Sequence, residues 1–279
     1  MPDIMNPDII AKDVQKGGYN AAEMALITAE TERIYADLTK NAKPGDGKTF
    51  YITTGGPGAG KTSLVSAAQK GDGMLSRAIH IDPDEVIKLF TPYRTEITQS
   101  GDTDAARVAA YSKWRWASVY MANTMVNKLA ADGFDIVLGT TGTSPAVGHI
   151  YDAAHRAGYG SVLLMCHANE ETRLASVAKR FETERRFTPE ADVKEKGNKL
   201  FPEVVALHLG KAHQTFIFWR GAVDAAPVLA AEYHGGQTVV RDMKAFSGFM
   251  AEMRVHKPEV DWAGVMGMQK KPDIKPPHI

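Results

Sequence analysis

An eight-residue motif, Gly55 to Thr62, constrains this chain more than any other feature of its sequence. It reads Gly-Gly-Pro-Gly-Ala-Gly-Lys-Thr and fills the pattern G-x-x-x-x-G-K-[ST] at every position. A β-rich run at Thr49–Thr53 precedes it and a helical run at Ser63–Ala68 follows it, the strand–loop–helix context of a phosphate-binding loop. A Gly-rich turn that matches by chance is the alternative, and the flanking strand and helix disfavour it. The motif therefore predicts a nucleoside triphosphate site.

The loop and the first turn of its helix supply the predicted nucleotide contacts. Glycines let backbone N–H groups turn inward around phosphate oxygens, and the helix N-terminus adds partial positive charge. Lys61 is predicted to contact the β- and γ-phosphates of ATP, and the Thr62 hydroxyl to ligate Mg²⁺. The predicted nucleotide-binding residues are Gly56, Pro57, Gly58, Ala59, Gly60, Lys61, Thr62 and Ser63.

The order of elements after the loop predicts an α/β fold. Alternation of strands and helices is typical of an open, mostly parallel sheet with right-handed crossovers and helices on both faces. Residues 46–245 form the predicted core, residues 1–45 a helical extension, and residues 246–279 a C-terminal segment with a loose tail. The expected strands are Ala78–Ile81, Phe134–Leu138, Ser161–Cys166 and Pro227–Glu232, and the expected helices are Asp104–Ala131, Asn169–Arg180 and Pro202–Trp219.

Composition and charge exclude several classes of protein. Lys plus Arg and Asp plus Glu are 33 each, so no global field favours nucleic acid or an anionic membrane as a partner. Cys166 is the only cysteine, so no intrachain disulfide forms and a reducing compartment is expected. The N-terminus lacks the apolar stretch of a secretion signal, and no run of eighteen apolar residues occurs. The sequence predicts a cytoplasmic protein.

The segment Asp82–Glu85 carries two carboxylates with separable interpretations. Asp82 before Pro83 is typical of a helix N-cap, and Glu85 would close a capping box. Asp84 is not needed by that cap. It follows a strand of the open sheet, where such folds place their ligands, and could accept a proton from an acceptor hydroxyl. A first-turn acid that complements the helix dipole is the equal alternative.

The third strand is followed by Gly139, Thr140, Thr141, Gly142 and Thr143, a turn with hydroxyls but no carboxylate. A hydrolytic motor places an acid here, so the turn favours a pocket for a hydroxylated acceptor, contacted by Thr141 and Thr143. A tight turn without function is the alternative.

Basic residues gather at the end of the helix that follows the fourth strand. Positioned arginines stabilise the charge that spreads over a transferring phosphoryl group, so an arginine-bearing lid is the mechanistic interpretation. A solvated face is the alternative, because Glu182 and Glu184 are interleaved. The basic residues are Arg173, Lys179, Arg180, Arg185 and Arg186.

Taken in order, these segments resemble the zeta toxin family over about residues 48–240. The matching segments are the phosphate-binding loop, Ile81–Glu85, Thr140–Gly142, Arg180–Glu182 and Arg186–Pro189. The resemblance implies a cytosolic P-loop kinase fold, phosphorylation of UDP-N-acetylglucosamine on a sugar hydroxyl, and a small helical antitoxin as partner.

The resemblance also assigns roles to single residues. Lys61 and Thr62 would serve ATP and Mg²⁺, Asp84 would be the general base, and Thr141 would contact the acceptor sugar. Arg180 and Arg186 would be the lid arginines at the transferring phosphoryl group.

Two positions depart from the family pattern. Well-known members carry a glutamate where this chain has Gly139 and an arginine where it has Thr143, and the spacing between the lid arginines is shorter here. The ATP half of the site is therefore expected to be intact and the acceptor half altered. Another P-loop metabolite, antibiotic or nucleic-acid-end kinase, and a nucleotide-dependent switch that controls a protein partner, remain alternatives.

Overall fold

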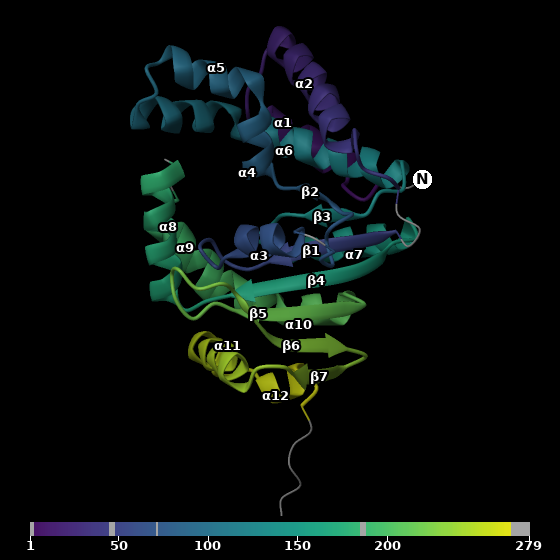
Figure 1. Cartoon of the computed structure of the whole chain (residues 1–279), viewed down its shortest axis with the longest axis vertical. Coiled ribbons are helices and arrows are strands. Elements are labelled where there is room, and N and C mark those ends of the chain that lie inside the picture. The colour runs from purple at the N-terminus through teal and green to yellow at the C-terminus, as the bar shows by residue number, and fades with distance from the viewer. Residues whose placement is uncertain (1–2, 45–47, 71, 185–187, 269–279) are drawn as a thin grey trace, which may run out of the picture.

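A seven-stranded sheet in the order β2-β3-β1-β4-β5-β6-β7 forms the centre of the molecule (Figure 1). The computed structural model describes residues 3–44, 48–70, 72–184 and 188–268. Neighbouring strands from β2 to β5 pair in parallel, and β6 and β7 continue the sheet in antiparallel pairing. The predicted open, mostly parallel sheet is confirmed. The strands are β1 (Thr49–Thr54), β2 (Ile79–Ile81), β3 (Ile136–Leu138), β4 (Gly160–His167), β5 (Gln214–Trp219), β6 (Val228–His234) and β7 (Gln237–Val240).

Helices precede, connect and follow these strands. The predicted helix Asp104–Ala131 is confirmed as α6, with Thr103 as its N-cap. The other helices are α1 (Pro7–Gln15), α2 (Ala21–Thr39), α3 (Lys61–Ala68), α4 (Pro83–Leu89), α5 (Thr91–Gln99), α7 (Val147–Arg156), α8 (Glu170–Glu184), α9 (Glu190–Lys194), the π-helical turn η1 (Glu195–Leu200), α10 (Phe201–Lys211), α11 (Met243–His256) and α12 (Trp262–Val265).

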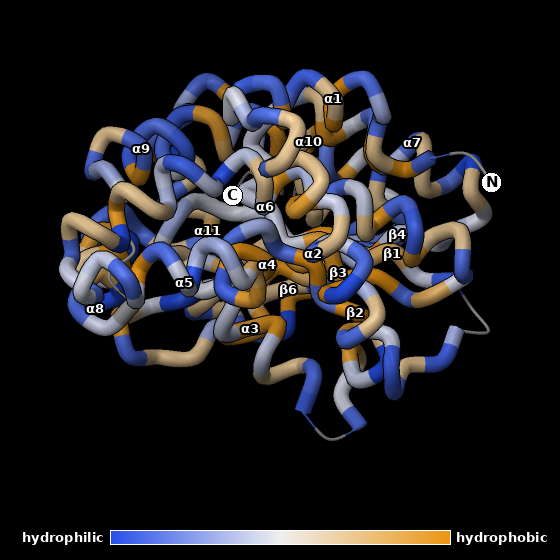
Figure 2. Tube along the Cα trace, turned by 90° about the horizontal axis from the view of Figure 1, so that it is seen from above, coloured by the Kyte–Doolittle hydropathy of each residue, from blue (hydrophilic) through white to orange (hydrophobic). Residues whose placement is uncertain are grey.

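Alternate residues of the central strands serve two separate apolar clusters. Phe50 and Ile52 of β1 point into the larger cluster, which includes residues of α6, α7, α10 and α11. Tyr51 of the same strand joins a smaller cluster with Leu64 and Val65 of α3. Figure 2 shows the hydrophobic residues concentrated along the inner strands. Burial on both faces explains the nearly continuous apolar runs of these strands.

The helix expected at Pro202–Trp219 is wrong in its second half. Helix α10 ends at Lys211, and Ala212 has an extended backbone (φ −74°, ψ 139°). The following residues, Gln214–Trp219, pair with Val162–His167 of β4. An apolar run rich in aromatic and β-branched residues fits a buried strand as well as a helix, so periodicity alone does not separate the two. The sheet continues through this strand into β6 and β7.

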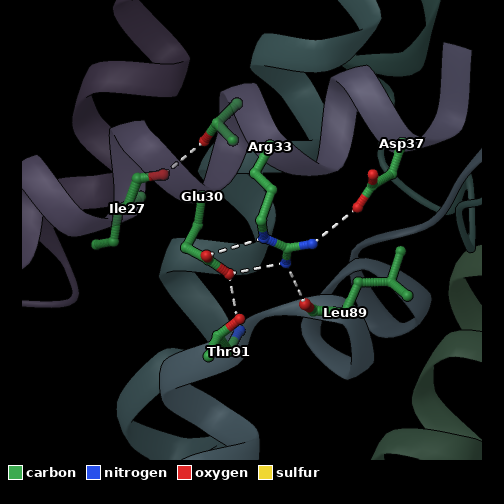
Figure 3. A network of polar contacts seen from close by, with 7 residues as sticks. Ile27, Glu30, Arg33, Asp37, Leu89 and Thr91 are labelled. Carbon is green, nitrogen blue, oxygen red and sulfur yellow. Dashed lines mark hydrogen bonds and ion pairs between the residues drawn. The ribbon is translucent and has the colours of Figure 1, made fainter. Parts of the chain in front are cut away.

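The N-terminal helices pack onto α6 and onto the junction between α4 and α5. Arg33 of α2 donates hydrogen bonds to Glu30, Asp37 and the Leu89 carbonyl, and Glu30 accepts one from Thr91 N–H at 2.9 Å (Figure 3). The Arg33 hydrogen bond lowers the pKa of Glu30 to about 2. This network fixes α2 against the helix that carries Asp84.

The proposed division into an extension, a core and a C-terminal segment stays a prediction. Its first boundary, 45/46, lies outside the described residues, and its second, 245/246, falls within α11. The expected loose tail, Lys270–Ile279, also lies outside them. None of the described helices combines the length and apolar character that a membrane crossing requires.

Two buried histidines make the fold sensitive to acid. Burial lowers the pKa of His208. It also lowers the pKa of His167, to well below the ordinary histidine value of 6.5. His167 stacks on Phe201 with ring centroids 4.4 Å apart, and neither of its ring nitrogens has a hydrogen-bond partner among the described residues. Both rings are therefore neutral in the folded protein at pH 7, while the unfolded chain takes up protons as the pH falls below about 6.5.

We expect the free energy of unfolding to fall as the pH drops below about 6.5, by up to about 1.4 kcal/mol per pH unit for each such histidine. The substitution His167→Phe keeps an aromatic ring against Phe201 and should reduce this slope by one proton. Urea unfolding between pH 5 and pH 7 measures it, with His149→Phe, at an exposed position, as the control. Equal slopes in wild type and His167→Phe would contradict the prediction.

Candidate active site

The phosphate-binding loop connects β1 to α3 at the carboxyl edge of the sheet. Gly55, Gly58 and Gly60 have positive φ angles of 141°, 79° and 99°, which glycine adopts without strain. A Cβ atom at Gly58 would lie 2.3 Å from the Arg173 carbonyl oxygen. Lys61 Nζ donates hydrogen bonds to the carbonyls of Gly55 at 2.8 Å and Gly56 at 3.2 Å. The strand–loop–helix arrangement that the sequence predicts is therefore present, with glycines at the positions that need positive φ angles.

A pocket of about 630 Å³ opens beside this loop and contains most of the predicted site. The loop residues that line it are Pro57, Gly58 and Gly60 to Ser63, whereas Gly56 and Ala59 are buried and do not line it. Other lining residues come from α4, α6, α8 and the turn after β3; they include Asp82, Asp84, Tyr111, Arg115, Thr141 and Arg180. Folding thus brings the predicted loop, base, acceptor contact and one lid arginine to a single pocket.

The two carboxylates of Asp82 and Asp84 have different environments. Asp82 Oδ1 accepts a hydrogen bond from Asp84 N–H at 2.8 Å, which confirms Asp82 as the N-cap of α4. The Glu85 carboxylate accepts from Lys88 at 2.9 Å. The Asp84 carboxylate accepts a hydrogen bond from Tyr111 Oη at 2.9 Å. Asp84 therefore presents its side chain to the pocket while Asp82 secures the helix start.

Gly139, at the end of β3, lies directly against Asp82. A Cβ atom at Gly139 would lie 2.5 Å from Asp82 Cβ and 2.6 Å from Asp82 Oδ2. Any larger side chain at position 139 would have to displace the N-cap of α4. With Asp82 in this position, the residue after β3 has no room for an acidic side chain.

Hydrogen bonds from Thr54 and His208 fix the backbone of the turn after β3. Thr54 Oγ1 donates a hydrogen bond to the Thr141 carbonyl at 2.9 Å, and His208 Nε2 lies 2.8 Å from the Gly142 carbonyl. Since a carbonyl only accepts, Nε2 carries the proton, and Tyr151 Oη donates to His208 Nδ1 at 2.9 Å. Thr143 is only 6 % exposed and does not line the pocket; its hydroxyl lies 3.3 Å from Thr141 Oγ1. The structure brings Thr141, but not Thr143, to the pocket.

The cationic cluster divides into a pocket-facing part and a buried part. Arg180 of α8 lines the pocket and donates a hydrogen bond to Thr188 Oγ1 at 2.9 Å. Lys179 forms an ion pair with Asp224. Arg185 and Arg186 lie outside the described residues.

Arg173, included in the lid by its sequence position, is instead fully buried. Its guanidinium donates hydrogen bonds to the carbonyls of Ala168 at 2.9 Å and Val193 at 2.7 Å, and to Asn198 Oδ1. Arg173 therefore joins the start of α8 to α9 and η1 underneath the phosphate-binding loop.

Arg220 is a pocket residue that the sequence interpretation missed. It follows β5, lines the pocket, and donates from Nη1 to the Gly58 carbonyl at 3.2 Å and from Nε to the Ala225 carbonyl at 3.1 Å. A strand assignment for residues 214–219 would have revealed it, because that strand ends at the same edge of the sheet as β1. Arg220 adds a cation beside the predicted phosphate site.

Comparisons with known proteins give one family and several similar folds. A model of the zeta toxin family matches residues 31–222. A structure from a study of the PezAT chromosomal toxin–antitoxin system of the human pathogen Streptococcus pneumoniae has a TM-score of 0.58 at 15 % identity, covering 87 % of this chain and 96 % of that one. The complex of AvrRxo1-ORF1 and AvrRxo1-ORF2 with ATP has a TM-score of 0.63 at 15 % identity, covering 87 % and 76 %. No curated protein sequence matches significantly. At these identities the two structures show a shared fold.

Proposed function

Because this chain belongs to the zeta toxin family, we propose that it is an ATP-dependent, Mg²⁺-requiring kinase that phosphorylates a hydroxyl of a nucleotide sugar. The observation that carries this proposal is one pocket of about 630 Å³ that is lined both by residues of the phosphate-binding loop and by Asp84. The fold shared with the ATP complex of AvrRxo1-ORF1 and AvrRxo1-ORF2 agrees with ATP as the nucleotide.

In the proposed mechanism, the loop and Lys61 bind the phosphates of ATP. The acceptor hydroxyl hydrogen-bonds to Asp84, which accepts its proton as the oxygen attacks the γ-phosphorus and the bond to the leaving ADP oxygen breaks. Arginines offset the charge on the transferring group. Two of them, Arg180 and Arg220, belong to the described residues, and the family resemblance assigns the same role to Arg186. Thr141 contacts the acceptor.

The donor set fits Mg²⁺, a hard cation that takes oxygen ligands. Thr62 is exposed at the start of α3 and lines the pocket together with the carboxylates of Asp82 and Asp84. The Thr62 hydroxyl would hold the ion, which neutralises charge on the phosphates when bound. No group of three or more histidine, cysteine or acidic side chains suited to a metal occurs within the described part of the chain.

Replacing Thr62 by valine removes this ligand and retains the side-chain shape. We expect the Mg²⁺ concentration for half-maximal activity to rise at least on the order of tenfold, because even the loss of an outer-shell partner lowers metal affinity by about 10–100-fold. A titration of activity against Mg²⁺ measures this, with Ser66→Ala, at an exposed position of the same helix, as the control. An unchanged Mg²⁺ requirement would exclude Thr62 as a ligand.

The acceptor class is tested by ADP release in the presence of candidate acceptors. UDP-N-acetylglucosamine, UDP-glucose, free N-acetylglucosamine and a DNA oligonucleotide with a 5′-hydroxyl separate nucleotide sugars from simple sugars and nucleic-acid ends. Stimulation only by the UDP-sugars supports the proposal. Stimulation by the oligonucleotide alone would replace it by a nucleic-acid kinase.

A small helical antitoxin is the proposed protein partner, and the cytoplasm the proposed location. Family membership supports both, together with the toxin–antitoxin system that the S. pneumoniae structure belongs to. Co-expression with the product of an adjacent short reading frame tests the partner. Failure of that product to suppress kinase activity would reject it as the antitoxin.

A further inference from the structure

Tyr111 lies where an acceptor hydroxyl is needed. Its Oη is 2.9 Å from Asp84 Oδ1, the hydrogen-bond distance at which a general base accepts a proton. Tyr111 and Asp84 come from different helices, α6 and α4, and are 27 residues apart in the chain, so this contact is a product of the tertiary fold. Both residues line the pocket that also contains Lys61, Thr62 and Arg180.

At this position the Tyr111 phenol has the contacts that the proposed mechanism requires of an acceptor hydroxyl. Its hydroxyl is the donor, since a carboxylate accepts, so its proton already points at the proposed base. A phenol is a better proton donor than an alkyl hydroxyl, and this one lines the same pocket as the phosphate-binding loop. Because the phenol belongs to the same chain, no entropy is lost in bringing a separate acceptor to the site.

We propose that the protein phosphorylates its own Tyr111, an inference that rests on the proposed kinase function. In this step Tyr111 Oη attacks the γ-phosphorus of ATP, its proton passes to Asp84, and the bond between the γ-phosphorus and the β,γ-bridging oxygen breaks to release ADP. The products are an O-phosphotyrosine and ADP, so atoms and charge balance without a further reactant.

Phosphorylated Tyr111 would block the acceptor half of the site. A phosphotyrosine carries a charge of about −1.5 to −2 at pH 7. That charge would lie beside the carboxylates of Asp82 and Asp84, where it repels an acceptor that is itself anionic. Autophosphorylation at Tyr111 is therefore self-inactivating, and it proceeds fastest when ATP is present and the acceptor is absent.

The test is incubation of the full-length protein with γ-labelled ATP and Mg²⁺, followed by intact-mass measurement and mapping of the labelled peptide. We expect one phosphoryl group per chain, located at Tyr111, with a rate constant independent of protein concentration. The label should fall to background in Tyr111→Phe and in Lys61→Ala. Tyr120→Phe alters the same helix at a residue that lines a separate pocket beside α1, and should retain the label.

Phosphorylation of UDP-N-acetylglucosamine, measured in parallel, separates the two proposals. Transfer to the sugar nucleotide by a chain that stays unmodified without acceptor would overturn the Tyr111 inference and leave the kinase function standing. Label on Tyr111 without transfer to any sugar would support the inference and reject the acceptor. Label on another residue, label that survives in Lys61→Ala, or no transfer of any kind would also overturn the inference.

Discussion

Replacing Arg173 by methionine is expected to lower the free energy of unfolding by about 3–5 kcal/mol, because three buried hydrogen bonds are lost. The guanidinium is fully buried and satisfies the Ala168 and Val193 carbonyls and Asn198 Oδ1. Methionine fills much of the same volume but leaves these acceptors without a donor, and each buried unsatisfied group costs about 1–3 kcal/mol.

Arg173 also supports the phosphate-binding loop. A Cβ atom at Gly56 would lie 3.2 Å from Arg173 Nη1, and one at Gly197 would lie 1.6 Å from it, so loop and η1 pack tightly on the guanidinium. We therefore expect Arg173→Met to weaken ATP binding as well. Arg173→Lys should not restore stability, because an ammonium group lacks the planar fork that reaches separate acceptors.

Urea unfolding measures the effect, with Lys179→Met as the matched control. Lys179 is on the same helix, but its side chain is 56 % exposed in a surface ion pair, so its loss should change stability by less than about 1 kcal/mol. Similar losses in Arg173→Met and Lys179→Met would contradict the role assigned to the buried arginine.

Replacing Asp84 by asparagine should reduce phosphoryl transfer by about 10²–10⁴-fold, the contribution of a positioned general base. The asparagine amide keeps the size of the side chain and its contact with Tyr111. It cannot take up the proton from the substrate hydroxyl. ATP affinity should stay unchanged, because the proposed phosphate contacts come from the loop after β1 and not from Asp84.

The matched control is Asp104→Asn, which also removes an acid from the first turn of a helix. If Asp84 only complemented the helix dipole, the two variants would show the same small loss of stability, about 0.3–1 kcal/mol, and normal transfer. A single-turnover assay with ATP binding measured in parallel decides between these roles. Full activity of Asp84→Asn would reject Asp84 as the base.

The sequence predicted those features that depend on local chemistry. The phosphate-binding loop, the Asp82 cap, the long helix α6 and the buried strand around Cys166 follow from short-range patterns of glycine, capping residues and apolar runs. The open α/β sheet followed from the order of these elements, and the P-loop kinase fold from the resemblance to the zeta toxin family.

Features that depend on long-range packing could not be predicted in this way. The Tyr111–Asp84 hydrogen bond requires α6 to pack against α4, and the burial of Arg173 requires its hydrogen bonds to Val193 of α9 and Asn198 of η1. Local charge made Arg173 resemble its neighbours in the lid, although its partners are backbone carbonyls. Thr143 was expected in the pocket with Thr141, but the tight turn directs it inward.

The most direct test of the central claim is transfer of label from γ-labelled ATP to UDP-N-acetylglucosamine, with Lys61→Ala and Asp84→Asn as controls. The proposed function predicts a labelled sugar nucleotide that is lost in both variants. Slow ADP release that the sugar nucleotide does not stimulate, with no label on it, would contradict a nucleotide-sugar kinase.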